Sequence, residues 1–174
     1  MLIRRLPWLF LAAAAAAGAA GCRWSARSGL PDHIRTVSVP MFENRTGEYG
    51  LETALTEALR RAVIQDPRVR LVNGGADAVL SGGVTAVRRR PVREDRDDRP
   101  AAMQAVVVAR FSFYDEAEGR WLVEDAEIDS AQASSARGLY SVAPSPRQRP
   151  EAPALDGAIE ALAAEMARRT LGMW

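Results

Sequence analysis

The chain has 174 residues, the size of a single domain, and its 23 basic and 22 acidic residues leave a formal net charge of +1. This balance argues against a general nucleic-acid-binding protein, which would be strongly basic. One histidine and one cysteine leave little for zinc sites, disulfides or nucleophilic catalysis, so we do not expect an enzyme.

Residues 1–21 have the pattern of a secretory signal peptide. Arg4 and Arg5 form a basic start, and a run rich in leucine and alanine follows over residues 6–20. This run is shorter than the ~20 residues that a membrane-spanning helix requires. It ends in Ala19-Ala20-Gly21-Cys22, which resembles a bacterial lipobox in which Ala19 replaces the usual leucine.

Cys22 is therefore expected to become the lipidated first residue of the mature protein. It is the only cysteine, and acylation would remove a thiol that has no disulfide partner in an oxidising compartment. The alternative is an ordinary signal peptide or a signal anchor with a chance cysteine. The next residue is Arg23 and not the aspartate that, by analogy with lipoprotein sorting, retains proteins in the inner membrane. We therefore expect a lipid-anchored, periplasm-facing protein of the outer membrane.

The mature chain is expected to begin with a tether, residues 22–32, which holds Ser, Gly and Pro and lacks apolar periodicity. β-branched residues over 33–39 predict a strand, and turn residues over 43–47 predict a loop. From about Gly50 the apolar residues recur at helical spacing, until Asp66-Pro67 ends the helix. The apolar stripe of this predicted helix comprises Leu51, Leu55, Ala58, Leu59, Ala62 and Val63.

The middle of the chain predicts further strands. Residues 68–72 read as a short strand, and 78–90 as a longer one in which Gly82-Gly83 favours a bulge. The charge-rich stretch 88–99 predicts a loop. Residues 103–114 give the clearest strand signal, because alternate positions on one face are apolar. Those positions are Val107, Ala109, Phe111 and Phe113.

The last part of the chain predicts a hairpin loop at 115–119, a returning strand over 121–128, and irregular structure over 130–153, where Ser, Arg and Pro are frequent. A final helix is expected from Pro153 to Leu171. The order of elements predicts an α+β fold for a single domain over residues 33–174. It would be a mixed, mostly antiparallel sheet of four to five strands with two helices packed on one side.

Residues that could carry catalysis or bind a metal are scarce. His33 lies beside the tether, so we interpret it as an exposed surface residue and not as a catalytic one. The Gly74-Gly75 and Gly82-Gly83 pairs lack the Lys-Ser/Thr that follows the glycines of a phosphate-binding loop. The sequence predicts no catalytic residue, no metal and no cofactor. Three aspartates that could suggest a cation site alternate with arginines, which favours a solvated loop: Asp95, Asp97 and Asp98 with Arg93, Arg96 and Arg99.

Several stretches resemble the lipopolysaccharide-assembly lipoprotein family, LptE. Its members share Leu-Pro-x-His-Ile, here Leu30–Ile34, and then Val-x-Val-Pro-x-Phe-x-Asn, here Val37–Asn44, followed by a helix. The next shared segment, Ala-Asp-Ala-x-Leu-x-Gly, is Ala76–Gly82 here. Lipoproteins of the curli-secretion and penicillin-binding-protein-activator type carry a similar Pro-Phe-x-Asn-x-Thr-Gly segment and are the alternative.

The resemblance to LptE implies work at the outer membrane. Members sit as a plug within a β-barrel partner, LptD, support the folding of that partner and take part in delivering lipopolysaccharide to the cell surface. No cofactor and no nucleic acid is implied, and the membrane is contacted through the lipid anchor. The alternative families imply a binding module for an envelope enzyme or a secretion pore.

With this function in view, Arg88, Arg89 and Arg90 are candidate ligand-binding residues at the end of a predicted strand. Guanidinium groups bind phosphate through bidentate, charge-assisted hydrogen bonds, so the triplet could contact lipid A or an acidic wall of the barrel. The alternative is a solvated strand end whose charge nearby acids offset. Since successive strand residues point to opposite faces, Arg88 and Arg90 should act together and Arg89 apart.

Overall fold

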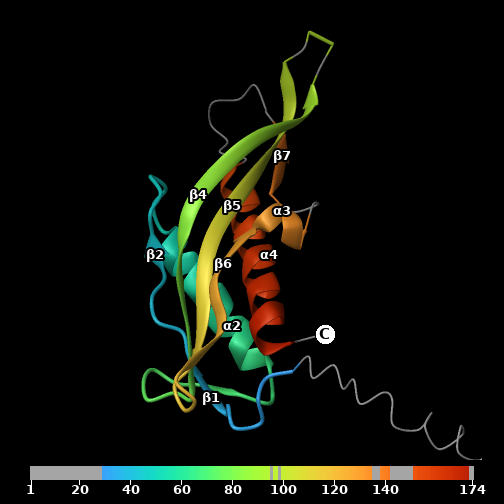
Figure 1. Cartoon of the computed structure of the whole chain (residues 1–174). Coiled ribbons are helices and arrows are strands. Elements are labelled where there is room, and N and C mark those ends of the chain that lie inside the picture. The colour runs from blue at the N-terminus through green and yellow to red at the C-terminus, as the bar shows by residue number, and fades with distance from the viewer. Residues whose placement is uncertain (1–28, 95, 98, 135–137, 142–150, 173–174) are drawn as a thin grey trace, which may run out of the picture.

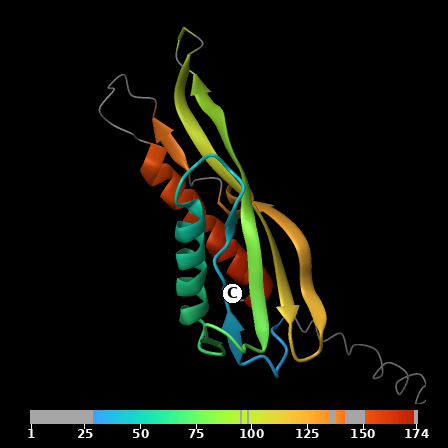
Figure 2. The same ribbon diagram turned by 90° about the vertical axis from the view of Figure 1, so that its left-hand side faces the viewer.

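The structure, a computed structural model, describes residues 29–94, 96–97, 99–134, 138–141 and 151–172. It has the predicted α+β fold, with two long helices against one face of a mixed sheet (Figures 1 and 2). The strands are β1 (Thr36–Ser38), β2 (Glu43–Asn44), β3 (Arg70–Leu71), β4 (Ala78–Glu94), β5 (Pro100–Asp115), β6 (Arg120–Asp129) and β7 (Leu139–Ser141). The helices are α2 (Leu51–Gln65), α3 (Ser130–Ala133) and α4 (Glu151–Leu171).

The sheet has a continuous path of five strands in the order β3-β1-β4-β5-β6. β1 runs parallel to both β3 and β4, so β1, α2 and β3 form a β-α-β unit. β4, β5 and β6 are antiparallel neighbours and form the expected meander. Two short strands were not predicted: β2 lies inside the expected loop over 43–47 and pairs with β4, and β7 pairs with β5.

The core lies between the sheet and the two long helices. The predicted apolar face of β5 is buried at every position, and so is the predicted stripe of α2 apart from Ala62, which is half-buried. Burial of such faces supplies most of the stability of a domain this size. The core residues that α4 contributes include Ile159, Leu162 and Met166.

The prediction of a loop over 88–99 was wrong for residues 88–94, because β4 continues to Glu94. It was right for the described turn at residues 96–97, before β5 begins at Pro100. The two strands pair from Arg88 with Val106 to Glu94 with Pro100, and we call this part the distal ribbon. Every residue of β4 from Arg88 to Glu94 is exposed. An exposed strand has no buried face, so its sequence shows no apolar alternation and reads as a loop.

The glycine pair in β4 does not mark a bulge, because the nearest register shift lies between Val84 and Ala86. Gly82 is required for close packing instead. A Cβ atom at this position would lie 2.2 Å from the carbonyl oxygen of Arg110 and 2.9 Å from the ring of Phe42. The absent side chain therefore makes room for Phe42 in the core.

The stretch 130–153 is only partly irregular. It contains the short helix α3 and the strand β7, and α4 begins at Glu151, before Pro153. Asp129 caps α3, since its side chain accepts a hydrogen bond from the backbone N–H of Gln132. Residues 142–150 lie outside the described residues, so the prediction for them is not tested.

The two ends of the sheet differ. At one end, which we call the base, Asp115 of β5 lies opposite both Ala78 and Arg120, and β1 begins nearby. The distal ribbon lies at the other end (Figure 1). β4 alone has 17 residues, which corresponds to about 55 Å at the usual rise of a strand. The described chain starts at the base, because His33 contacts Asp115.

Candidate functional site

The three arginines of the sequence hypothesis lie inside β4 and not at its end. Arg88 is opposite Val106, Arg89 opposite Ala105 and Arg90 opposite Gln104 on β5. Residues directly opposite in an antiparallel pair lie on the same face, and neighbours along a strand lie on opposite faces. Arg88 and Arg90 therefore share the face turned away from the helices, while Arg89 lies on the helix side, as predicted.

Arg89 is held within the domain. Its guanidinium forms an ion pair at 2.5 Å with Glu48, in the loop before α2, and another with Glu151 at the start of α4. The hydrogen bond to Glu48, and then the one to Glu151, raise the pKa of Arg89 above its ordinary value. Arg89 thus joins the ribbon to the loop before α2 and to the start of α4. The sequence carried no signal of this, because the partners are 41 and 62 residues away.

Arg88 and Arg90 form the candidate binding face. Arg90 donates two hydrogen bonds, of 2.9 and 2.7 Å, to Oε1 of the buried Gln104. These bonds orient the guanidinium and leave its other N–H groups to further acceptors. Arg88 is exposed and forms no ion pair with any residue that the structure describes. Two exposed arginines that lie two residues apart on the same face of a strand can bind a phosphate or a carboxylate.

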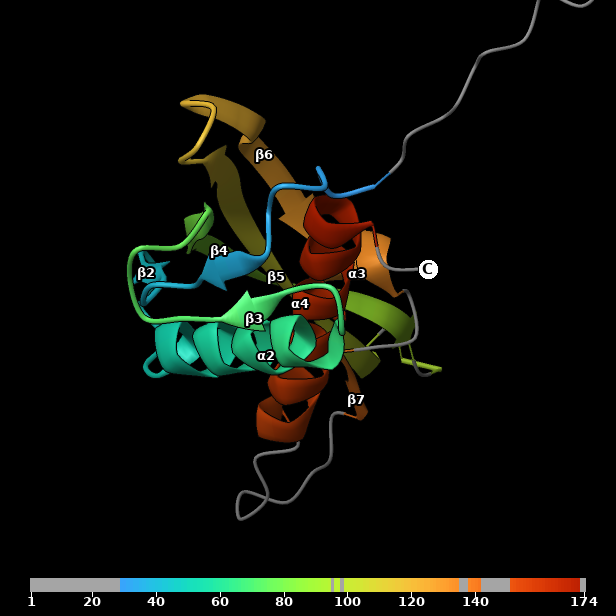
Figure 3. The same cartoon turned by 90° about the horizontal axis from the view of Figure 1, so that it is seen from below.

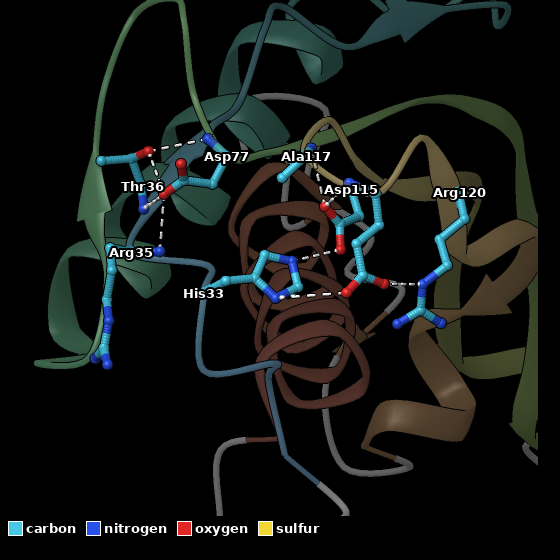
Figure 4. Close-up of polar contacts among 8 residues, drawn as sticks. His33, Arg35, Thr36, Asp77, Asp115, Ala117 and Arg120 are labelled. Carbon is cyan, nitrogen blue, oxygen red and sulfur yellow. Dashed lines mark hydrogen bonds and ion pairs between the residues drawn. The ribbon is translucent and has the colours of Figure 1, made fainter.

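His33 is exposed, as expected, and it also links the start of the domain to the turn between β5 and β6 (Figure 4). Nε2 lies 2.7 Å from Oδ2 of the fully buried Asp115, and Nδ1 lies 3.8 Å from Oε1 of Glu118. Oδ1 of Asp115 accepts hydrogen bonds from the backbone N–H groups of Ala117 and Glu118. Burial acts to raise the pKa of Asp115, but the hydrogen bonds from Glu118 and His33 hold that pKa below its ordinary value.

His33, Asp115 and Glu118 also bring their potential metal ligands within 4.8 Å of one another. The spacing of these residues in the sequence did not indicate the cluster, because His33 lies 82 residues before Asp115. Nε2 of His33 is already hydrogen-bonded to Asp115, and Glu118 also pairs with Arg120. We interpret the cluster as a link between chain segments and not as a metal site.

The motif residues quoted in the sequence stabilise the architecture. Oδ2 of Asp77 accepts hydrogen bonds of 2.8 to 2.9 Å from the backbone N–H groups of Arg35 and Thr36 and from the Thr36 hydroxyl. These bonds fasten β1 to the start of β4. Nδ2 of Asn44 donates to the backbone carbonyl of Glu48 at 2.7 Å and so shapes the loop that leads into α2. The motifs therefore specify the fold, and the candidate binding face of Arg88 and Arg90 lies elsewhere.

A cavity of about 840 Å³ lies at the base, between residues 29–32, the start of β6 and the end of α4. It is remote from the distal ribbon, so the structure does not bring the three arginines to it. None of the helices in the described part of the chain is both long enough and apolar enough to cross a membrane.

A model of the lipopolysaccharide-assembly family LptE matches residues 34–171 of the chain. No curated protein sequence matches it. Among solved structures, the chain is similar to a minor lipoprotein from Acinetobacter baumannii, with 18% identity, coverage of 79% of this chain and 90% of the other, and a TM-score of 0.50. At this identity the similarity supports the fold alone.

Two further structures overlap less well. A PelC dodecamer from Paraburkholderia phytofirmans has 15% identity, covers 82% of this chain and 91% of its own, and gives a TM-score of 0.48. Lipoprotein B from Nitrosomonas europaea has 13% identity, covers 82% and 87%, and gives a TM-score of 0.47.

Proposed function

The chain belongs to the lipopolysaccharide-assembly family LptE, whose model matches residues 34–171, and from this premise we propose that it fills and supports an LptD-like β-barrel that delivers lipopolysaccharide to the cell surface. It acts by binding and without catalysis. Lipid on Cys22 anchors it to the outer membrane, residues 22–32 form the tether, and the domain faces the periplasm. A tethered domain also gains effective concentration at its partner.

The observation that carries the proposal furthest is the distal ribbon, at the opposite end of the sheet from the tether. β4 extends for about 55 Å with 17 residues, whereas the apolar band of a barrel is about 25 Å tall. A domain held by its base at the periplasmic mouth is therefore long enough to carry the ribbon through the lumen. The lumen of such barrels is polar, which suits a strand that is exposed at every residue from Arg88 to Glu94.

Arg88 and Arg90 are the proposed contacts to the phosphates of lipopolysaccharide. They share an exposed face, and Gln104 orients one of them. Arg89 is not part of this contact, because Glu48 and Glu151 already occupy its guanidinium. In this proposal Arg88 and Arg90 bind lipopolysaccharide, and Arg89 stabilises the position of the ribbon.

Reversing both charges, Arg88→Glu with Arg90→Glu, is expected to weaken lipopolysaccharide binding by about ten-fold or more, since each charge-assisted hydrogen bond contributes about 1.5–3 kcal/mol. The melting temperature is expected to fall somewhat, because Arg90→Glu removes two hydrogen bonds to the buried Gln104, so binding is compared well below the melting temperature of the variant. Binding of the purified protein to lipopolysaccharide and its co-purification with the barrel would be measured across a salt series.

A matched control reverses two exposed arginines at the base, Arg35→Glu with Arg70→Glu. It changes the net charge equally, so it should leave binding near that of the unchanged protein. Equal affinity of the ribbon variant and the control at low salt, where screening is weakest, would leave Arg88 and Arg90 as ordinary surface.

A further inference from the structure

By chain length, the proposed lipid attachment at Cys22 lies within a short reach of the base of the domain. Gly29 is the first described residue and lines the cavity at this end together with Arg120 of β6. Cys22 precedes it by seven residues, which span at most about 25 Å when fully extended. Figure 3 looks directly at this end and shows the described chain starting beside the last turn of α4.

An aromatic pair stands at the base on the face of the sheet turned away from the helices. Tyr114 of β5 lies opposite Trp121 of β6, with ring centroids 4.6 Å apart and a tilt of 60° between the rings. Trp121 is 47% exposed. A large aromatic ring that remains half in water, on a rigid strand, offers apolar area and an N–H donor to a partner.

The neighbouring arginines come with their own counter-ions. Arg120, Arg168 and Arg169 line the cavity at the base, but Glu118 pairs with Arg120 at 2.5 Å and Glu165 pairs with both Arg168 and Arg169. The three arginines that line this cavity are therefore neutralised by their own acids. What the base offers a partner is the exposed ring of Trp121, which stands beside the half-buried Tyr114.

We propose that the base rests against the headgroup region of the lipid leaflet that holds the anchor, with Trp121 at the level of the headgroups. The inference rests on the proposed lipidation of Cys22. Trp and Tyr side chains concentrate at membrane interfaces, where the ring meets apolar chains and the polar group meets water. Because Arg120, Arg168 and Arg169 are paired and the ring of Trp121 makes the contact, the contact needs no anionic lipid and does not weaken in salt.

The test uses the full lipidated protein in nanodiscs of phosphatidylcholine, half of them made with lipid that carries bromine near the headgroups. Trp24→Phe and Trp174→Phe leave Trp121 as the only tryptophan of the mature chain. The brominated lipid should lower its fluorescence about two-fold, as for an interfacial tryptophan, at low and at high salt alike.

The control places the only tryptophan in the ribbon, by Val92→Trp with Trp121→Phe in the same background. Val92 has the same exposed fraction as Trp121, 47%. The fluorescence of a tryptophan at position 92 should be the same in nanodiscs with and without brominated lipid. Unquenched Trp121 in nanodisc-bound protein would overturn the proposal and assign the aromatic pair to a protein partner or to water. Equal quenching of both positions would overturn it as well. If the purified protein carried no lipid and did not bind to nanodiscs, the proposed anchor at Cys22 would be wrong, and this proposal would be overturned with it.

Discussion

Replacing Leu55 with alanine is expected to lower the free energy of unfolding by ~2–5 kcal/mol. Leu55 lies on the buried face of α2 at 0% exposure, within the cluster that joins both long helices to the sheet. The substitution removes apolar area from that cluster and leaves a cavity that a packed interior fills only in part. Urea denaturation of the purified protein would measure the loss.

The matched control is Ile64→Ala on the same helix. Ile64 is 65% exposed, so its truncation should cost less than about 0.5 kcal/mol. A loss of that small size for Leu55→Ala would show that the face of α2 assigned to the core is wrong.

Replacing Cys22 with serine is expected to move the protein from the membrane to the soluble periplasmic fraction. Each buried CH₂ group of an acyl chain contributes ~0.8 kcal/mol, and two or more chains give stable anchoring. Serine in this place cannot carry the thioether-linked lipid, so the whole of that free energy is lost. Fractionation after a high-salt wash, with mass spectrometry of the first mature peptide, would measure the change.

Ser25→Ala, three residues further along the tether, is the control and should stay with the membrane. The Cys22→Ser fractionation is best done in cells that lack the barrel partner, because a partner could hold the unlipidated protein. In such cells, continued membrane binding of Cys22→Ser would contradict the proposed anchor.

The parts of the fold that could be predicted from the sequence are those with one buried face. α2 was expected between Gly50 and Asp66 and spans Leu51–Gln65, because its apolar residues recur at helical spacing. The four apolar positions of β5 were likewise recognised from alternation, and all four are buried. In both cases the local pattern and the tertiary packing require the same residues.

The distal ribbon and the short strands were missed for a physical reason. Arg88 to Glu94 are exposed, so their sequence lacks the alternation of apolar and polar residues that indicates a strand. β2 has only two residues, and what fixes it is its parallel pairing with Gly83 and Val84 on β4. Such pairing depends on parts of the chain that are distant in sequence, and a local pattern does not report it.

The candidate site was predicted only in part. Strand alternation correctly separated Arg88 and Arg90 from Arg89. The acids that occupy Arg89, the glutamine that orients Arg90 and the link between His33 and Asp115 all come from distant segments. These partners decide which arginines remain available for a ligand.

The most direct test of the central claim is to purify the lipidated protein from detergent-solubilised outer membrane and to identify what co-purifies. We expect a large β-barrel of the lipopolysaccharide-assembly type at a constant ratio to the lipoprotein, and less of it with Arg88→Glu and Arg90→Glu together. Recovery of a peptidoglycan synthase or of a self-assembled pore, without such a barrel, would contradict the proposed function.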